Sequence, residues 1–272
     1  MIDSHTHSLH SHDGHETILS MIRKAKKLGL VYLAITDHLD LDYLFCETSS
    51  ERKLNIKKYH KSFQRASFLQ TISSLKGVQL AFGVEVGYSQ KSVSLYKEEL
   101  PQYPFDIIIN SVHTLNDIDL YHFLPKNQPA EKKEIFIDYL NAVYDSIDPG
   151  YEYDVLGHIG YVSRYVTYFK KNLLFDDTRD IIDMILKKAI NLDKTIELNT
   201  NVKSLPQHTI PESAIIKRYR ELGGENLTFG SDAHLLNRIG DGYENARQLA
   251  LSCGFKYWTI YLKRIPKKIL IN

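Results

Sequence analysis

Residues 31–38 read Val-Tyr-Leu-Ala-Ile-Thr-Asp-His, an apolar, β-prone run that ends in a carboxylate and an imidazole. A short apolar run of this kind favours a strand buried on both faces, as in a parallel sheet. We expect such strands before His5 and at 31–36, 79–86, 105–110, 153–157, 195–199, 227–230 and 256–261. Helical patterns separate them, at 18–28, 57–75, 131–146, 178–191, 211–222 and 243–252. This alternation predicts a parallel sheet covered by helices, either a barrel or a doubly wound sheet.

Two of these helices have recognisable ends in the sequence. Thr17 is suited to cap the first helix at its N-terminus, and Gly29 is suited to stop it. In the fifth helix, Pro211 is suited to the first helical position, and Gly223-Gly224 to the stop.

Residues that commonly bind metal ions stand at or just after the ends of the expected strands. They are His5, His7, Asp37, His38, Glu85, His113, His158, Asp232 and His234. In a (β/α) barrel the C-terminal ends of the strands converge on one face, where active sites are built. We therefore expect side chains from opposite ends of the chain to meet in one cleft.

The residue types indicate a catalytic metal site. Imidazoles and carboxylates without thiolates suit Zn²⁺, Mn²⁺ or Fe²⁺ in catalysis, whereas structural zinc sites are rich in cysteine. In His5-Thr6-His7 the two imidazoles of an extended segment point the same way, so both can bind one ion. A carboxylate such as Glu85 can bridge two ions, and ions roughly 3.5–4 Å apart can hold a hydroxide that attacks a phosphoryl group.

The motifs that contain these residues resemble, in order, those of the PHP (polymerase and histidinol phosphatase) superfamily. They are His5-Thr6-His7, Thr36-Asp37-His38, Gly83-Val84-Glu85, Ser111-Val112-His113, Gly157-His158 and Ser231-Asp232-Ala233-His234. The resemblance covers essentially the whole chain. It implies a single domain over 1–272 with a distorted, TIM-like (β/α)7 barrel and three divalent metal ions at the C-terminal ends of the strands.

The resemblance also implies which residues bind each ion. The first ion would be held by His5, His7, Glu85 and Asp232. The second would share Glu85 and take His113 and His158. The third would take His38, His234 and one residue of 11–14, where Asp13 is preferred to His12 because it directly precedes Gly14.

Several further segments resemble the histidinol phosphatases within this superfamily. They are residues 105–113, 153–159, 197–200 and 231–234, the last followed by Ile239-Gly240. This implies hydrolysis of histidinol phosphate in histidine biosynthesis. We expect Glu85 and Asp232 to be catalytic residues, Asp232 because a ligand of the attacking hydroxide can accept a proton and pass it on. Asp232 is preferred to the His234 side of the cluster as the group that relays a proton to the leaving alkoxide. The resemblance to the histidinol phosphatases ends at 201–204. This chain has Asn-Val-Lys-Ser there, where we expect a sequence that contains glycine and arginine.

Four residues are candidates for binding the substrate. Arg164 follows His158 closely, and its guanidinium is suited to binding phosphate through two hydrogen bonds. Lys203 and Arg238 also lie near strand ends, and His15 is a candidate for lining the pocket. We further expect Asp37 to orient the imidazole of a metal ligand.

The composition indicates where such an enzyme acts and what it does not bind. With 34 Lys and Arg against 33 Asp and Glu, the chain has no general attraction to nucleic acid or an acidic membrane. Its two cysteines, Cys46 and Cys253, suit a reducing compartment. We find no leader segment and no run near the roughly 20 apolar residues that span a bilayer, so we expect a cytoplasmic protein. The expected partner is a small phosphomonoester, and no feature indicates an oligomeric state.

Three alternative functions remain open. Another PHP phosphoesterase, acting on nucleotides or other small phosphomonoesters, would use the same ligands. A non-catalytic metal-bound barrel is disfavoured because no expected ligand is missing. An amidohydrolase-like enzyme also begins with His-x-His, but it usually requires a metal-bridging lysine at a strand end, and the sequence offers none there.

Overall fold

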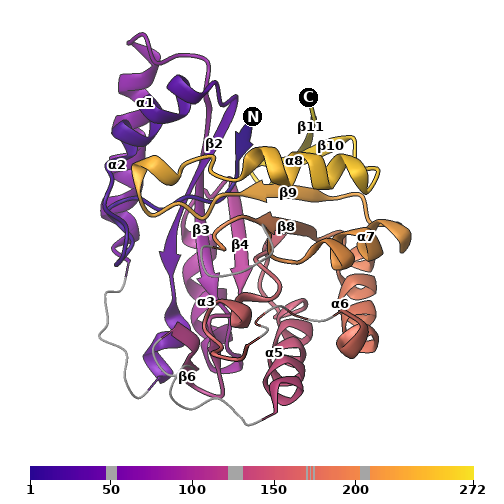
Figure 1. The fold of residues 1–272 in the computed structure, drawn as a ribbon. Helices are drawn as coiled ribbons and strands as arrows, with labels where there is room; N and C mark the ends of the chain where they lie inside the picture. The colour runs from indigo at the N-terminus through magenta and orange to yellow at the C-terminus, as the bar shows by residue number, and fades with distance from the viewer. Residues whose placement is uncertain (47–53, 122–130, 170, 172, 174, 203–208) are drawn as a thin grey trace.

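The computed structural model describes residues 1–272 except 47–53, 122–130, 170, 172, 174 and 203–208. Its main sheet consists of parallel strands arranged in chain order, namely β1 (Ile2–Asp3), β2 (Tyr32–Leu39), β3 (Gln79–Gly87), β4 (Ile107–Ser111), β7 (Val155–Leu156), β8 (Thr195–Asn199) and β9 (Leu227–Gly230). The first and last strands also meet, because the Ser4 amide donates to the Phe229 carbonyl at 2.9 Å. The sheet therefore curls into a nearly closed, distorted (β/α)7 barrel (Figure 1), which confirms the predicted fold class.

Helices cover the outside of this barrel (Figure 1). They are α1 (Ile18–Leu28), α2 (Ile56–Thr71), α3 (Val93–Glu99), α5 (Lys132–Ser146), α6 (Arg179–Asn191), α7 (Ser213–Glu221) and α8 (Tyr243–Ser252). In α1, Thr17 accepts a hydrogen bond from the Ser20 amide, and Gly29 adopts φ 74° at the C-cap, as expected. None of the helices in the described residues has both the length and the hydrophobicity needed to cross a membrane.

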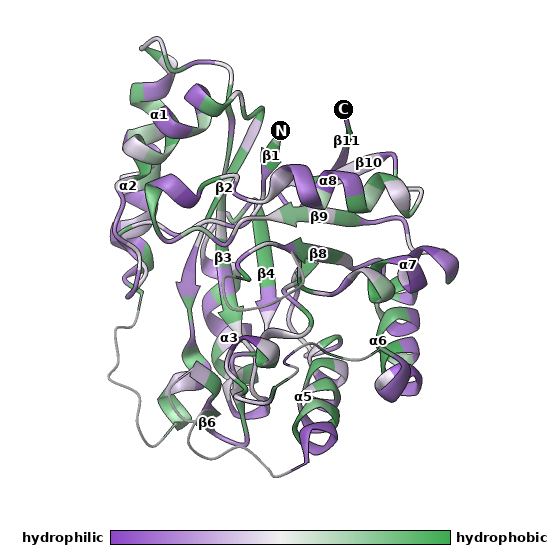
Figure 2. Ribbon diagram, in the orientation of Figure 1, coloured by the Kyte–Doolittle hydropathy of each residue, from purple (hydrophilic) through white to green (hydrophobic). Residues whose placement is uncertain are grey.

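The strands are hydrophobic along the core and polar where they end. Figure 2 shows β4 as hydrophobic over most of its length and hydrophilic at its arrowhead. The sequence of β4, Ile-Ile-Ile-Asn-Ser, is buried throughout, including its last two polar residues. Burial of polar side chains at the strand ends requires that they contact other polar groups. These ends therefore mark the functional face of the barrel.

The run at 256–261 does form a strand, but the expectation that it joins the parallel sheet is wrong. Instead, β10 (Tyr257–Leu262) pairs antiparallel with β11 (Ile265–Leu270). The turn between them places Lys263 and Arg264 at φ 52° and 65°. This hairpin lies across the N-terminal side of the barrel, where the Lys263 amide donates to Asp106, just before β4, at 2.7 Å. It therefore covers the opening opposite the polar strand ends.

Two helix boundaries differ from expectation by more than one residue. The helix α7 begins at Ser213, and Pro211 lies before it because Glu212, the N-cap, is still extended. The helix α2 ends at Thr71, short of the expected position 75. There the Gln70 side-chain amide donates to the carbonyls of Leu75 and Val78, which turns the chain toward β3.

Candidate metal centre

The predicted ligands meet at the C-terminal ends of the strands. His38 and Glu85 lie near the ends of β2 and β3, and the other ligands come from the segments that follow β1, β4, β7 and β9. Backbone hydrogen bonds align these segments: the His7 amide donates to the Ala233 carbonyl at 2.9 Å, and the Asp232 amide donates to the His5 carbonyl at 2.8 Å. Residues from both ends of the chain are therefore neighbours, as the barrel predicts.

Glu85 stands at the centre of the cluster. Its Oε2 lies 3.1 Å from His5 Nε2, 3.5 Å from His7 Nε2 and 3.1 Å from His38 Nδ1. Its Oε1 lies 2.8 Å from His158 Nε2 and 3.2 Å from His113 Nε2. One carboxylate thus faces five imidazoles, with one oxygen turned toward each side of the cluster.

Two groups of ligand atoms meet at Glu85. His5, His7 and Asp232 form the first group, in which Asp232 Oδ1 lies 3.3 Å from His7 Nε2. Glu85, His113 and His158 form the second. Within each group the ligand atoms lie within 4.8 Å of one another, and all these side chains are buried.

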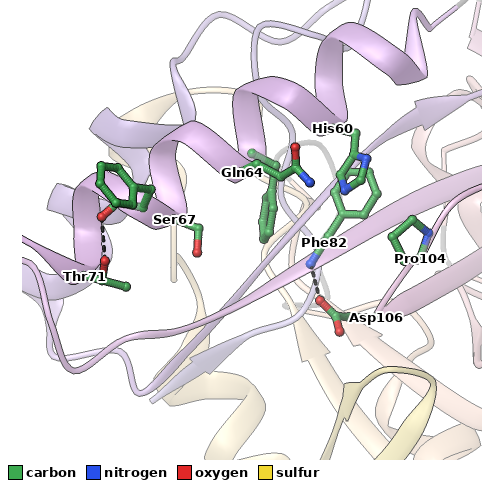
Figure 3. A pocket seen from close by; sticks show the side chains of 9 residues that line it. His60, Gln64, Ser67, Thr71, Phe82, Pro104 and Asp106 are labelled. Carbon is green, nitrogen blue, oxygen red and sulfur yellow. Dashed lines mark hydrogen bonds between the residues drawn. The ribbon is translucent and has the colours of Figure 1, made fainter.

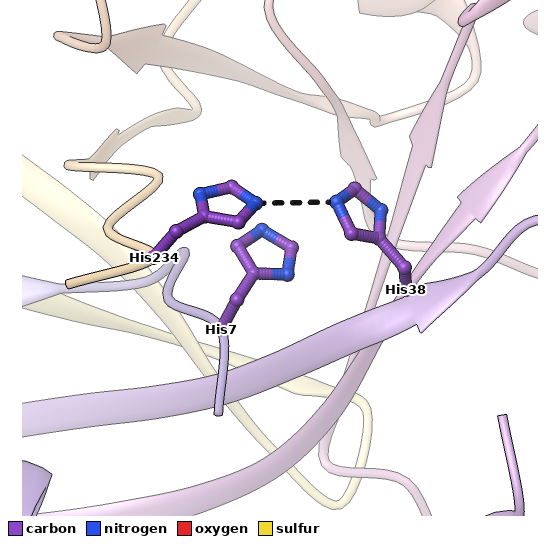
Figure 4. A group of neighbouring side chains, drawn as sticks. All are labelled: His7, His38 and His234. Atoms are coloured by element: carbon purple, nitrogen blue, oxygen red, sulfur yellow. Dashed lines mark hydrogen bonds between the residues drawn. The ribbon is translucent and has the colours of Figure 1, made fainter. Parts of the chain in front are cut away.

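A third group consists of His7, His38 and His234, whose rings lie close together (Figure 4). The Nε2 atoms of His38 and His234 are 3.4 Å apart. The Asp13 carboxylate approaches both, at 3.0 Å from His234 Nε2 and 3.8 Å from His38 Nε2. The His12 ring centre lies 5.3 Å from that of His38. The geometry therefore favours Asp13 over His12 beside this pair.

Several buried ligand atoms lack hydrogen bonds, and this tests whether metal ions fit the cluster. His5 Nε2, His7 Nε2 and Glu85 Oε2 are buried and make no hydrogen bond. Leaving a buried polar atom unsatisfied costs about 1–3 kcal/mol, so three converging atoms of this kind need another partner. A divalent cation that accepts nitrogen and oxygen ligands provides one.

The electrostatics of the cluster also suit cations. Burial alone would raise the pKa of Glu85, but His5, His113 and His38 hold this pKa well below its usual range. The pKa of Asp232 is also held well below its usual range, because His5 and Arg164 outweigh the effect of burial. Burial and the neighbouring His234 and His38 lower the pKa of His7. The site therefore offers anionic carboxylates and a neutral imidazole, the forms that bind metal.

Metal affinity is expected to rise with pH. In the metal-free protein, Glu85 and other nearby carboxylates outweigh burial and raise the pKa of His5 and of His113 well above the usual value, and Asp40 with Glu85 raises that of His38 to about 10. Each imidazole must lose its proton before it binds an ion, so zinc affinity should increase about tenfold per pH unit for each proton displaced. Competition with a chromophoric chelator between pH 6 and 8 measures this slope. An affinity that does not change with pH would contradict the charge state inferred for the cluster.

Two buried carboxylates beside the ligands were not predicted. Asp40 places one oxygen 3.1 Å from His38 Nδ1 and the other 3.1 Å from His113 Nδ1. Glu197 lies 2.6 Å from His5 Nδ1. Carboxylates of this kind commonly orient metal-binding imidazoles. In the sequence, Glu197 is an acid inside the apolar strand at 195–199, and Asp40 follows His38 by two positions. These positions are the signals that could have identified them.

Asp37 does not play the part expected of it. Its carboxylate accepts hydrogen bonds from the amides and hydroxyls of Ser8 and Ser11 at 2.6–3.2 Å, and its side chain is directed toward these serines and away from the cluster of imidazoles. The Ser11 hydroxyl in turn lies 3.2 Å from His7 Nδ1. Asp37 therefore shapes the loop after β1 and reaches an imidazole only through Ser11, because its side chain turns away from His38.

The predicted substrate-binding residues occupy different surroundings. Arg164 is 9% exposed, lies 3.0 Å from Asp232 Oδ2 and donates to Asn199 Oδ1 at 2.8 Å. Its guanidinium also lies over the Tyr161 ring. Arg238 pairs with Asp241, and His15 is exposed. Lys203 lies outside the described residues. Of the four, Arg164 is the one that the structure shows in contact with the cluster.

A cavity of about 410 Å³ lies elsewhere on the molecule (Figure 3). It is bounded by α2 and by the start of β4, and its lining includes His60, Phe68, Phe82 and Asp106. None of the clustered ligands lines it. The Asp106 carboxylate there accepts a hydrogen bond from the Phe82 amide, so it supports the backbone between β3 and β4. This cavity is separate from the candidate metal centre.

Comparison with known proteins identifies the family. A model of the PHP domain matches residues 3–201, well over half of the chain. This chain belongs to the PHP family. All the residues of the cluster except Asp232 and His234 fall within the matched range, and those two lie beside β1, where the barrel closes.

Relatives of the chain place it more narrowly within the PHP family. A probable histidinol-phosphatase from Clostridium acetobutylicum is 33% identical over 98% of this chain and 99% of its own length. A histidinol-phosphatase from Lactococcus lactis is 30% identical over 93% of this chain and 91% of its own. A crystal structure of the histidinol phosphate phosphatase from Lactococcus lactis, with zinc, L-histidinol and phosphate, superposes with a TM-score of 0.87, 27% identity and 98% coverage of each chain. The chain is thus a PHP protein of the histidinol-phosphatase family.

Proposed function

We propose that this chain is a metal-dependent histidinol-phosphatase, which hydrolyses L-histidinol phosphate to L-histidinol and phosphate in histidine biosynthesis. The observation that carries the proposal is Glu85, a buried carboxylate in contact with five imidazoles at the functional face of the barrel. Supporting observations are the family membership and the zinc, histidinol and phosphate in the related crystal structure. Both cysteines are free, which fits the reducing cytoplasm.

Three divalent ions, of zinc, manganese or iron, fit the residues of the cluster. His5, His7, Glu85 and Asp232 would hold the first, and Glu85, His113 and His158 the second. His38, His234 and Asp13 would hold the third. Bound ions would supply Lewis acidity, which neutralises phosphate charge and acidifies water.

Asp232 is the side chain best placed to move a proton. Its Oδ1 faces His7, and its Oδ2 pairs with Arg164, so the carboxylate lies between the ligand cluster and a buried cation. Hydrolysis forms a bond from phosphorus to the oxygen of water, breaks the bond to the ester oxygen and leaves an alkoxide that needs a proton. Asp232 would accept a proton from the attacking water and return it to that alkoxide. Its lowered pKa keeps the carboxylate ionised and so free to accept a proton.

Arg164 is the expected phosphate-binding cation. Arg164→Met should lower kcat/KM about 10- to 100-fold, mainly by raising KM, because a charged hydrogen bond to phosphate is lost. Arg164→Lys should recover part of the loss, since it keeps the charge without the planar fork. Steady-state kinetics and inhibition by inorganic phosphate measure both effects. An unchanged KM and unchanged phosphate inhibition in Arg164→Met would remove Arg164 from the substrate site.

A substrate panel tests the proposed function. Purified protein, loaded with zinc or manganese, is offered L-histidinol phosphate, nucleoside monophosphates and p-nitrophenyl phosphate at equal concentrations. We expect kcat/KM for histidinol phosphate to exceed the others by at least about 10²-fold, because a site built for a polar substrate strongly rejects analogues that leave its groups unpaired. Equal or better hydrolysis of a nucleotide would indicate a different PHP phosphoesterase.

A further inference from the structure

Glu197 holds two parts of the metal centre at once. Its side chain projects from the middle of β8 and is fully buried. Oε1 lies 2.6 Å from His5 Nδ1, and Oε2 accepts a hydrogen bond from the His158 backbone amide at 2.7 Å. Asn199 also donates to Oε1, at 3.1 Å. One carboxylate therefore joins the segments that follow β1 and β7.

The barrel leaves room for this carboxylate at one glycine. Gly230, at the end of β9, faces Glu197 and His5. A Cβ atom at position 230 would lie 2.2 Å from Glu197 Oε1 and 2.6 Å from His5 Cβ. Both distances are far shorter than a van der Waals contact, so the glycine is required for the carboxylate and the imidazole to meet.

The hydrogen bonds determine which nitrogen of His5 carries the proton. An ionised carboxylate only accepts hydrogen bonds, so His5 Nδ1 must be the donor. When His5 is neutral, as it must be to bind metal, Nε2 is the nitrogen that keeps a lone pair, and it is the atom that lies 3.1 Å from Glu85 and 3.8 Å from Asp232. A neutral imidazole binds metal through this lone pair.

We propose that Glu197 is a positioning residue that fixes His5 in the tautomer able to bind metal and ties it to His158. The inference rests on the metal centre of the proposed function, but not on the identity of the substrate. A carboxylate is required because His5 and Asn199 donate to one oxygen and the His158 amide donates to the other, so both oxygens must be acceptors.

The decisive variant is Glu197→Gln, which keeps the shape and changes one acceptor into a donor. When its oxygen accepts from the His158 amide, its NH₂ group faces His5 Nδ1 and donates to it. The His5 proton then moves to Nε2, the atom aimed at Glu85 and Asp232, and blocks coordination there. Glu197→Asp keeps two acceptor oxygens on a shorter side chain, so it should preserve the tautomer.

A matched control is available at the opposite end of the barrel. Asp154 is also buried and accepts hydrogen bonds from the Ile108 amide and from Arg264, away from the cluster. Asp154→Asn therefore makes the same change from carboxylate to amide without touching an imidazole. This control therefore shows how a buried amide affects folding when the metal centre is left unchanged.

The experiment measures zinc and the imidazole proton directly. Zinc affinity and stoichiometry are determined for the full chain and the three variants, and long-range ¹H–¹⁵N NMR of the zinc-loaded proteins reports which nitrogen of His5 carries the proton. We expect Glu197→Gln to weaken zinc binding about 10- to 100-fold and to shift His5 to the Nε2–H form. Glu197→Asp should keep the Nδ1–H form, and Asp154→Asn should bind zinc as the unaltered chain does.

Two results would overturn the inference. One is an unchanged tautomer with normal zinc binding in Glu197→Gln. The other is equal loss of zinc in Glu197→Gln and Asp154→Asn, which would reduce Glu197 to a structural role. If Glu197→Gln does not fold, an Nε2–H tautomer in Glu197→Asp would be equally contradictory. If the zinc and NMR results are as expected but the protein does not hydrolyse histidinol phosphate, only the proposed substrate is contradicted.

Discussion

Glu85→Gln is expected to lower kcat/KM by about 10³-fold or more and to reduce the number of ions bound. Bound metal stabilises the charge of the transition state by several kcal/mol, and each 1.4 kcal/mol corresponds to a factor of ten in rate. Because both Glu85 oxygens face imidazoles, the amide disturbs both sides of the cluster at once. Phosphate release and elemental analysis on the same sample measure the two effects.

Ser111, which lies beside Glu85, provides a milder variant for comparison with Glu85→Gln. The Ser111 hydroxyl donates to Glu85 Oε1 at 2.7 Å. Ser111→Ala removes that support and leaves the carboxylate, so it should cost about tenfold, far less than Glu85→Gln. Full activity and full metal content in Glu85→Gln would show that this carboxylate does not hold the ions.

Asp232→Asn is expected to lower kcat by about 10³-fold with a much smaller change in KM. The substitution removes the proposed proton relay and one charged metal ligand, and general acid–base catalysis alone contributes about 10²–10⁴-fold. Asparagine is the appropriate replacement because Asp232 has φ 50°, a left-handed conformation that asparagine tolerates. The barrel should therefore remain folded.

Separate measurement of kcat and KM in saturating metal distinguishes the roles of Asp232. A variant that regains full kcat at high metal concentration would show that Asp232 acts only as a ligand. Thermal unfolding of the metal-free protein provides the control for folding, and it should change little. A kcat equal to that of the unaltered chain at all metal concentrations would exclude Asp232 from the chemistry.

Much of the fold follows from local sequence signals. The strands over 195–199 and 227–230 and the helix over 18–28 have the predicted bounds, the helix because Thr17 and Gly29 mark its ends. The pairing of β10 was not predictable in this way. Its hairpin turns at Lys263 and Arg264, two residues with positive φ and no glycine to signal the turn.

The ligand cluster was predictable because its residues recur at strand ends, and strand ends converge in a barrel. The supporting contacts were not, since they depend on side chains that meet across strands. Glu197 reaches His5 only because β9 has a glycine at position 230. Asp37 instead turns toward Ser8 and Ser11, a choice that the motif Thr36-Asp37-His38 does not reveal.

The most direct measurement strips the protein with a chelator, restores zinc or manganese in steps, and follows bound metal and phosphate release from histidinol phosphate together. We predict no turnover in the metal-free protein and recovery that follows the filling of the cluster, up to three ions per chain. Normal turnover without metal, or a reconstituted protein that binds no ions, would contradict the claim that these histidines and carboxylates form a catalytic metal centre.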